Sequence, residues 1–172
     1  MIRVSQYFGI LYTLLVIGQV ILCNYNPFGP YVTLTLLPAM IMCIPTGIGT
    51  IMTMFIAFIS GLSVDWLADG ILGLNAAAAL PLALLRNTIL KAFLGEDLVN
   101  RHAPFSFRKN GITQITVVLA TFTTIFLTFY IILDGAGTLE TWFCFVKGIL
   151  SLICNLILGA IVVNILSPDE RK

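Results

Sequence analysis

Charged residues are scarce in this chain of 172 residues. Lysine, arginine, aspartate and glutamate together make up 10% of it, whereas about 25% is usual for a soluble domain. Hydrophobic residues make up 59%, the mean hydropathy is +1.02 and the net charge is +1. A soluble domain this apolar could not cover its own surface. The composition therefore excludes a soluble enzyme and a secreted disulfide scaffold, and the lack of a basic patch excludes nucleic acid as a partner.

Side chains that bind metals or carry redox chemistry are also few. His102 is the single histidine, and Cys23, Cys43, Cys144 and Cys154 lie scattered through apolar segments without paired spacing. One histidine without a cysteine or acidic cluster is a poor metal site. Isolated cysteines behave as small hydrophobic residues. We expect no metal, no cofactor and no catalytic residue.

Long apolar segments take the place of charge. A spanning helix needs about 20 mostly apolar residues, and turn-forming or polar residues divide the chain into six apolar segments: 7–23, 31–44, 48–62, 71–94, 111–133 and 141–166. Segment 31–44 is the shortest, and either a full span or a re-entrant hairpin with 48–62 fits it. The longest loop is too short to fold independently. We therefore expect an all-α integral membrane protein, a six-transmembrane-helix bundle that forms a single multipass membrane domain over residues 1–172.

The basic residues favour one orientation of this bundle. If the N-terminus is cytoplasmic, every basic residue except Lys147 falls on or near the cytoplasmic face, with Arg86 reaching that face by extending along its helix. The acids of the opposite connections are Asp65, Asp69, Asp134 and Glu140. This asymmetry follows the positive-inside rule, so we expect both termini to be cytoplasmic.

One polar stripe crosses the last apolar segment. It consists of Lys147, Ser151, Asn155 and Gly159, which repeat at i, i+4. Residues with this spacing share one face of a helix, where small and polar side chains favour close helix contacts. The stripe therefore predicts internal packing, with a ligand-lining or partner-binding groove as the alternative. Lys147 could pair with Asp65, Asp69 or Glu140, or extend to the headgroups.

A local motif follows the third apolar segment. It reads Gly61-Leu62-Ser63-Val64-Asp65, then Asp69-Gly70, then Leu72-Gly73-Leu74-Asn75-Ala76. Asp65 and Asp69 lie near the interface in one segment, whereas proteolysis by paired carboxylates needs them at depth on facing helices. Asp69 could instead cap the helix that begins after Gly70. Gly61 and Gly73 allow close backbone approach. We expect a rigid polar corner that suits docking of a partner.

This motif resembles that of the rod shape-determining protein MreD family, which has G-L-x-x-D followed shortly by L-G-x-x-A. The matching residues are Gly61, Leu62, Asp65, Leu72, Gly73 and Ala76. The resemblance implies a non-enzymatic scaffold of the bacterial cell-elongation machinery in the inner (cytoplasmic) membrane. It also implies an MreC-like single-span partner and contact with the cell-wall synthases that make peptidoglycan. On this basis we expect Asp65→Asn, or a bulky residue at Gly61 or Gly73, to weaken partner binding more than folding.

The MreD family is also distantly similar to the substrate-binding subunits of energy-coupling-factor transporters. This similarity implies an alternative function, a small-molecule-binding membrane subunit of a vitamin transporter. Its site would be built from Asp65, Asp69, Trp66, Trp142 and Lys147. A membrane lipid could also occupy the bundle.

Overall fold

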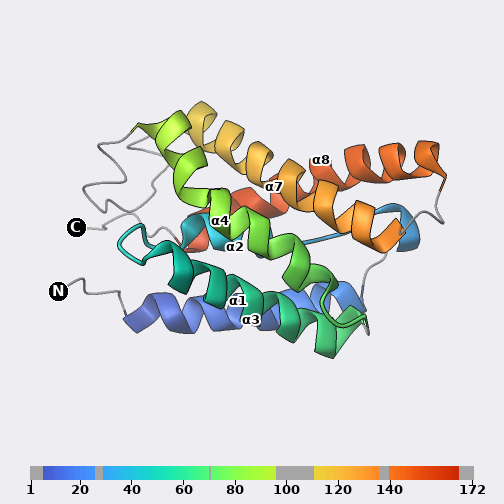
Figure 1. Cartoon of the computed structure of the whole chain (residues 1–172), viewed down its shortest axis with the longest axis horizontal. Helices are drawn as coiled ribbons and strands as arrows, with labels where there is room; N and C mark the ends of the chain where they lie inside the picture. The colour runs from blue at the N-terminus through green and yellow to red at the C-terminus, as the bar shows by residue number, and fades with distance from the viewer. Residues whose placement is uncertain (1–5, 26–28, 70, 96–110, 136–139, 167–172) are drawn as a thin grey trace.

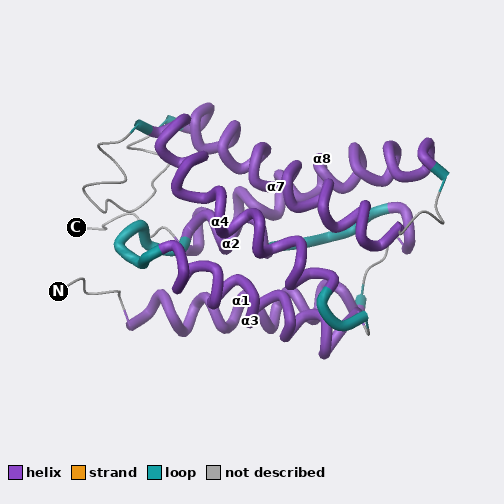
Figure 2. Tube along the Cα trace, viewed as in Figure 1, coloured by secondary structure: helices purple, strands orange, loops and turns teal. Residues whose placement is uncertain are grey.

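The computed structural model describes residues 6–25, 29–69, 71–95, 111–135 and 140–166. Within these ranges the chain is helical and contains no strand (Figures 1 and 2). The elements are α1 (Gln6–Asn24), the short turn η1 (Gly29–Tyr31), α2 (Leu37–Cys43), α3 (Thr50–Val64), the π-helical turn η2 (Asp65–Asp69), α4 (Leu74–Leu94), α7 (Ile112–Gly135) and α8 (Thr141–Leu166). The prediction of an all-α protein is confirmed for this part of the chain.

The long helices alternate in direction along the bundle (Figure 1). One end, which we call the Asp65 end, carries η1, η2, the C-terminus of α7 and the N-terminus of α8. The opposite end, which we call the Arg86 end, carries the turn between α2 and α3 and the end of α4. α1 begins and α8 finishes at the Arg86 end. The segment that contains α2 runs from the Asp65 end to the Arg86 end through the middle of the bundle (Figure 2).

Four helical stretches are long and apolar enough to cross a membrane: Thr50–Ala68, Leu74–Leu94, Ile112–Gly135 and Trp142–Leu166. The apolar part of α1, Phe8–Asn24, is shorter than these. The segment 31–44 differs most from a spanning helix, because only the seven residues of α2 are helical. The chain therefore has the character of a multipass membrane protein, with one segment that is mostly not helical.

Large apolar side chains lie on the outer surface of the bundle, and small ones lie at a close helix contact in its interior. Ile149, Ile153, Ile157 and Ile161 form an exposed ridge on α8 with a spacing of four residues. Alanines are buried instead at the contact between α3 and α4, where small side chains let two helices approach closely.

The short helix α2 forms the centre of the core. All seven of its residues are buried, and it contacts α1, α3, α4, α7 and α8. Pro38 lies in its first turn, where the missing N–H of proline has no intrahelical partner to lose. Residues 32–35 before α2 have no helical hydrogen bonds, and we call them the extended segment.

Candidate functional site

The corner between α3 and α4 is held by a buried carboxylate. Asp65 is fully buried, and its Oδ2 accepts hydrogen bonds from the backbone N–H groups of Gly73 (3.0 Å) and Ala76 (3.2 Å). Its Oδ1 accepts from the backbone N–H (2.8 Å) and the side-chain Nδ2 (2.9 Å) of Asn75. We call these four residues the Asp65 clasp. The carboxylate thereby caps the N-terminus of α4, where unpaired N–H groups and the helix dipole favour negative charge.

Two glycines of the motif make this corner possible. A Cβ on Gly61 would lie 2.6 Å from both Cα and N of Ala76, which is too close for α3 and α4 to keep their contact. Gly73 has a φ of +97°, a conformation that residues with a side chain rarely adopt. The structure therefore brings Gly61, Asp65, Gly73 and Asn75 together as one unit.

Large apolar side chains are exposed on the described part of the corner's outer surface. Trp66, Leu67, Ile71 and Leu72 are exposed there, whereas Asp65 points inward. The cap of α4 predicted for Asp69 is supplied by Asp65; the side chain of Asp69 and all of Gly70 lie outside the described residues. Direct contact of a partner with the Asp65 carboxylate would require the clasp to open.

The polar stripe of α8 binds the extended segment. The Thr33 N–H donates to Oγ of Ser151 (2.9 Å), and the Thr35 N–H donates to Oδ1 of Asn155 (2.8 Å). Nδ2 of Asn155 donates in turn to the Thr33 carbonyl (2.9 Å). Both Ser151 and Asn155 are buried. Their side chains thus satisfy backbone groups that would otherwise be unpaired in an apolar interior.

Gln19 of α1 binds the other side of the same segment. Its Nε2 donates to the Leu34 carbonyl (3.1 Å), and its Oε1 accepts from the Leu36 N–H (2.6 Å). Successive residues of an extended chain present their backbone groups to opposite sides, as in a β-ladder. The side-chain amides of Gln19 and Asn155 therefore form the hydrogen bonds that two neighbouring strands would form with a central β-strand.

Gly159 of the stripe packs internally as well. A Cβ on Gly159 would lie 2.9 Å from the methyl carbons of Leu119 on α7, so this glycine allows α7 and α8 to approach. The space beside Ser151 and Asn155 is occupied by the extended segment of the chain itself. Internal packing, rather than an open groove, is the arrangement that the described residues adopt here.

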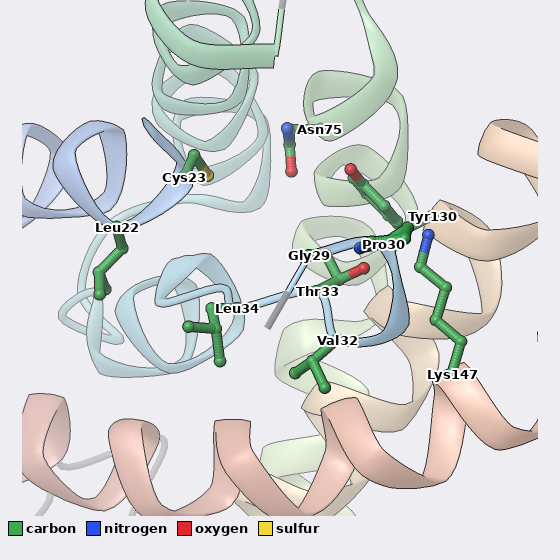
Figure 3. Close-up of a pocket in the computed structure, with 10 residues that line it drawn as sticks. All are labelled: Leu22, Cys23, Gly29, Pro30, Val32, Thr33, Leu34, Asn75, Tyr130 and Lys147. Carbon is green, nitrogen blue, oxygen red and sulfur yellow. The ribbon is translucent and has the colours of Figure 1, made fainter. Parts of the chain in front are cut away.

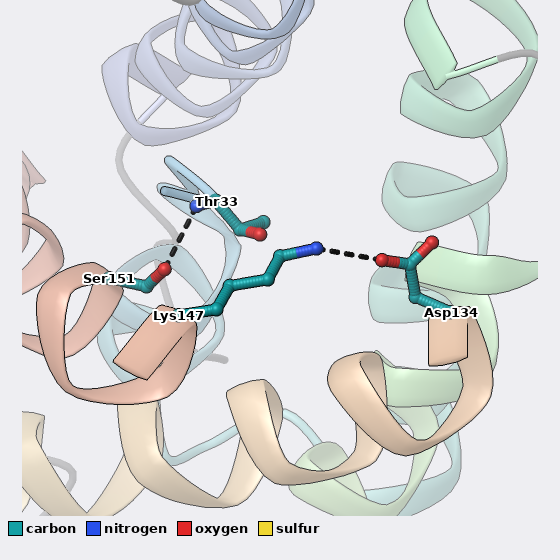
Figure 4. Close-up of polar contacts among 4 residues, drawn as sticks. All are labelled: Thr33, Asp134, Lys147 and Ser151. Atoms are coloured by element: carbon teal, nitrogen blue, oxygen red, sulfur yellow. Dashed lines mark hydrogen bonds and ion pairs between the residues drawn. The ribbon is translucent and has the colours of Figure 1, made fainter. Parts of the chain in front are cut away.

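Lys147 pairs with an acid that the sequence analysis did not assign to it. Its Nζ lies 2.7 Å from Oδ2 of Asp134 (Figure 4). The centre of the Tyr130 ring is 5.9 Å from the same Nζ. The expected partners Asp65 and Glu140 are not in contact with it in the described part of the chain: Asp65 is held in the clasp. The ion pair joins the end of α7 to the second turn of α8.

Lys147 also lines a cavity of about 170 Å³ (Figure 3). Polar side chains from three helices reach it, namely Asn75, Tyr130 and Lys147. Thr33 and Val32 of the extended segment and Cys23 of α1 line it as well. The cavity therefore lies where the elements of the Asp65 end converge.

Arg86 is buried at the opposite end and does not extend to the surface as expected. It is 1% exposed, and its Nη2 donates to the carbonyls of Met42 (3.4 Å) and Ile44. These carbonyls lie at the C-terminus of α2, where a cation is favoured by the helix dipole. The hydrogen bonds attach α4 to the core helix.

An apolar groove of about 340 Å³ runs between α7 and α8 on the outside of the bundle. Thr124, Thr128 and Gly148 line it together with the larger Ile132 and Phe145. No described element covers Thr124 or Thr128, which are exposed. A function can be attached to this groove or to the cavity beside Lys147.

Sequence reasoning missed Gln19, Asp134 and Tyr130, because their roles depend on contacts between distant segments. The only available signal was chemical: each carries a polar group within or next to a long apolar run. Polar groups in such positions are costly unless they have a partner.

Comparison of the chain with models of protein families, with curated proteins and with solved structures finds no significant match. The fold and the two hollows are therefore interpreted from their own geometry and from the sequence motif.

Proposed function

We propose that this chain is a non-enzymatic scaffold of the bacterial cell-elongation machinery, located in the inner membrane with both termini cytoplasmic. In this role it resembles the MreD family and binds the transmembrane helix of an MreC-like single-span protein, alongside cell-wall synthases. The motif around Gly61, Asp65 and Gly73 supports the resemblance. The groove between α7 and α8 is the observation that carries the binding role.

The floor of the groove is small and apolar. The hydroxyls of Thr124 and Thr128 donate to the carbonyls of Ala120 and Thr124, each at 2.8 Å, so their hydrogen-bonding capacity is used within α7. A Cβ on Gly148 would find only Cδ1 of Ile131 nearby, at 3.6 Å. Small residues let transmembrane helices approach each other closely. The floor is therefore open to side chains of another helix.

Larger side chains form the walls of the groove. Phe145 is 67% and Ile132 is 65% exposed, and they flank the small residues from α8 and α7. A small floor between bulky walls suits the packing of side chains from one helix into holes on another, which is how helices associate in lipid. This relief favours a transmembrane helix as the occupant.

The experiment is to fill the groove without disturbing the fold. Gly148→Leu adds a side chain whose Cβ is sterically accommodated, and Ala160→Leu adds the same side chain at an exposed position elsewhere on α8. Each tagged variant is purified from its native membrane in gentle detergent, and an MreC-like partner is quantified by mass spectrometry. We expect wild type and Ala160→Leu to retain it and Gly148→Leu to lose at least nine tenths.

Two results would contradict this proposal. One is recovery of the partner with Gly148→Leu at the wild-type level. The other is a normal rod shape in cells depleted of the protein, because a scaffold of cell elongation is needed for that shape.

The second candidate is the small-molecule-binding subunit of a vitamin transporter, which the cavity beside Lys147 favours. The positions of the expected site residues and the volume of the cavity both place this candidate second. Trp66 and Trp142 are 77% and 76% exposed and do not line the cavity, and Asp65 is enclosed in its clasp. The volume of about 170 Å³ is also below the roughly 300–1,000 Å³ of pockets for drug-sized ligands. A vitamin retained stoichiometrically through purification would reverse this order.

A further inference from the structure

Backbone outside the α-helices forms part of the wall of the cavity that Lys147 lines. Five of the lining residues belong to η1 and the extended segment: Gly29, Pro30, Val32, Thr33 and Leu34. Within a membrane, non-helical backbone is tolerated where it is buried in protein or lines a water-filled cavity. This part of the wall is therefore compatible with water inside the bundle.

Polar side chains from three helices line the same cavity (Figure 3). Asn75 of α4, Tyr130 of α7 and Lys147 of α8 carry an amide, a hydroxyl and an ammonium group, all of which form hydrogen bonds with water. An engineered cavity of about 150 Å³ with an apolar lining stays dry, whereas a roomy cavity with polar groups in its wall holds water. The lining of this cavity favours the second state.

Lys147 gives an independent reason for water at this place. It lies within Trp142–Leu166, a stretch long and apolar enough to cross a membrane, and it is 8% exposed. Ionisable side chains in such positions pair with another group or face a water-filled cavity. Lys147 pairs with Asp134 and also lines the cavity. Water in the cavity would therefore add to the stabilisation that the ion pair gives to the buried ammonium group.

The volume and the position of the cavity agree with this occupant. A volume of about 170 Å³ has room for roughly five water molecules, because each takes about 30 Å³ in the liquid. Four aromatic side chains, Tyr25, Tyr31, Trp66 and Trp142, are exposed at the same Asp65 end. Tryptophan and tyrosine gather at the boundary between membrane and water. The cavity therefore lies at an end of the bundle that is close to the aqueous phase.

We propose that this cavity binds a cluster of ordered water molecules. The cluster hydrates the backbone of residues 29–34, where the extended segment enters the bundle, together with the side chains of Asn75, Tyr130 and Lys147. The extended segment would thus begin its path in a hydrated site and continue between the side-chain amides of Gln19 and Asn155. This site is separate from the groove between α7 and α8 and does not depend on the proposed scaffold role.

The test is X-ray footprinting of the full-length protein in nanodiscs. Hydroxyl radicals that form from water within a protein oxidise the side chains beside that water, and mass spectrometry measures the rate at each residue. Tyr130 and Tyr12 form a matched pair, because both are 8% exposed and only Tyr130 is among the residues that line the cavity. Tyr12 packs against α3 instead, with its hydroxyl 3.1 Å from Oγ of Ser60. We expect Tyr130 to be oxidised at least tenfold faster than Tyr12.

A variant that fills the cavity connects the oxidation to this site. Thr33→Leu places a larger apolar side chain in the wall and leaves the hydrogen bond from the Thr33 N–H to Ser151 possible. Thr116→Leu makes the same change at an exposed position on α7. We expect Thr33→Leu to slow the oxidation of Tyr130 at least threefold and Thr116→Leu to leave it unchanged.

Two results would overturn the proposal. One is oxidation of Tyr130 and Tyr12 at equal rates in the wild-type protein, which would mean that the cavity is dry. The other is an unchanged rate at Tyr130 in a folded Thr33→Leu variant, which would place the water elsewhere. The comparison of the two tyrosines in the wild type decides the question even where Thr33→Leu does not fold.

Discussion

Asp65 is a buried acid whose hydrogen bonds stabilise the corner between α3 and α4. Its two oxygens accept four hydrogen bonds from three residues at the start of α4. The negative charge is compensated by those donors and by the dipole of α4. A buried carboxylate in this state fixes the relative position of α3 and α4. Partner contact at this corner would use the exposed side chains beside it, such as Trp66 and Leu72.

The first prediction at this scale concerns Asp65→Asn. In the asparagine side chain an NH2 group replaces one carboxylate oxygen and faces the N–H donors that this oxygen accepted. The single remaining oxygen cannot accept all four hydrogen bonds. Hydrogen bonds to charged groups contribute about 1.5–3 kcal/mol each, and an unpaired buried group costs about 1–3 kcal/mol. We expect a loss of roughly 2–4 kcal/mol in the free energy of unfolding, measured by denaturant titration in detergent micelles.

Glu140→Gln is the matched control, because Glu140 is exposed and its change should leave stability within about 0.5 kcal/mol of wild type. This order of effects differs from the expectation drawn from the sequence, which placed partner binding first. An Asp65→Asn variant that unfolds like wild type but no longer binds a partner would restore that earlier expectation.

At the scale of elements, the extended segment is the feature that depends most on side chains elsewhere. Its backbone is paired on one side by Asn155 and Ser151 and on the other by Gln19. Non-helical backbone within a membrane is tolerated only where other groups of the protein form hydrogen bonds with its N–H and C=O groups, or where it lines a water-filled cavity. The polar residues of α1 and α8 thus determine that the segment before α2 is not helical.

The second prediction follows from this pairing. Asn155→Leu keeps a similar size but leaves the Thr33 carbonyl and the Thr35 N–H unpaired, each at about 1–3 kcal/mol. We expect unfolding to become easier by roughly 2–5 kcal/mol, measured as above. Asn164→Leu is the control, because Asn164 is exposed on the same helix. Equal stability of the two variants would show that the extended segment does not need this side chain.

The sequence predicted the long helices well, but it did not predict the conformation of segment 31–44. The apolar runs placed α4, α7 and α8 within a few residues of their observed bounds, because a run of that length can only be a helix in lipid. Segment 31–44 is apolar apart from Thr33 and Thr35. The periodicity of a short buried run does not distinguish a helix from an extended chain. Pro38 was a usable signal, since proline favours the first turn of a helix and so marks the start of α2.

Among the candidate sites, the sequence predicted the local motif but not the contact between separate helices. The sequence singled out Gly61, Asp65, Gly73 and Asn75, and the structure brings them together, because a turn of a few residues keeps neighbours in sequence close in space. The partner of Lys147 could not be predicted in the same way. Several acids lie near the ends of the apolar segments, and only the packing of α7 against α8 places Asp134 next to Nζ.

At the scale of the whole molecule, the path of residues 31–44 decides the topology. The end of α1 and the start of α3 lie at opposite ends of the bundle, with the extended segment and α2 between them (Figure 1). The start of α3 and the end of α4 lie at the same end of the bundle. If the bundle crosses a membrane along this axis, the segment crosses as an extended chain followed by a short helix. A re-entrant segment would instead return to the side on which it entered.

The third prediction tests this crossing with single cysteines. The four native cysteines are replaced by alanine, and one cysteine is introduced by Tyr25→Cys, Gly49→Cys or Lys91→Cys, all at exposed positions. Intact cells and inverted vesicles are treated with a maleimide that does not cross membranes. We expect the Tyr25→Cys variant to be labelled from one side and the other two variants from the opposite side. Equal labelling of all three after permeabilisation is the control. Labelling at positions 25 and 49 from the same side would mean that residues 31–44 do not cross, because one crossing between two positions must place them on opposite faces.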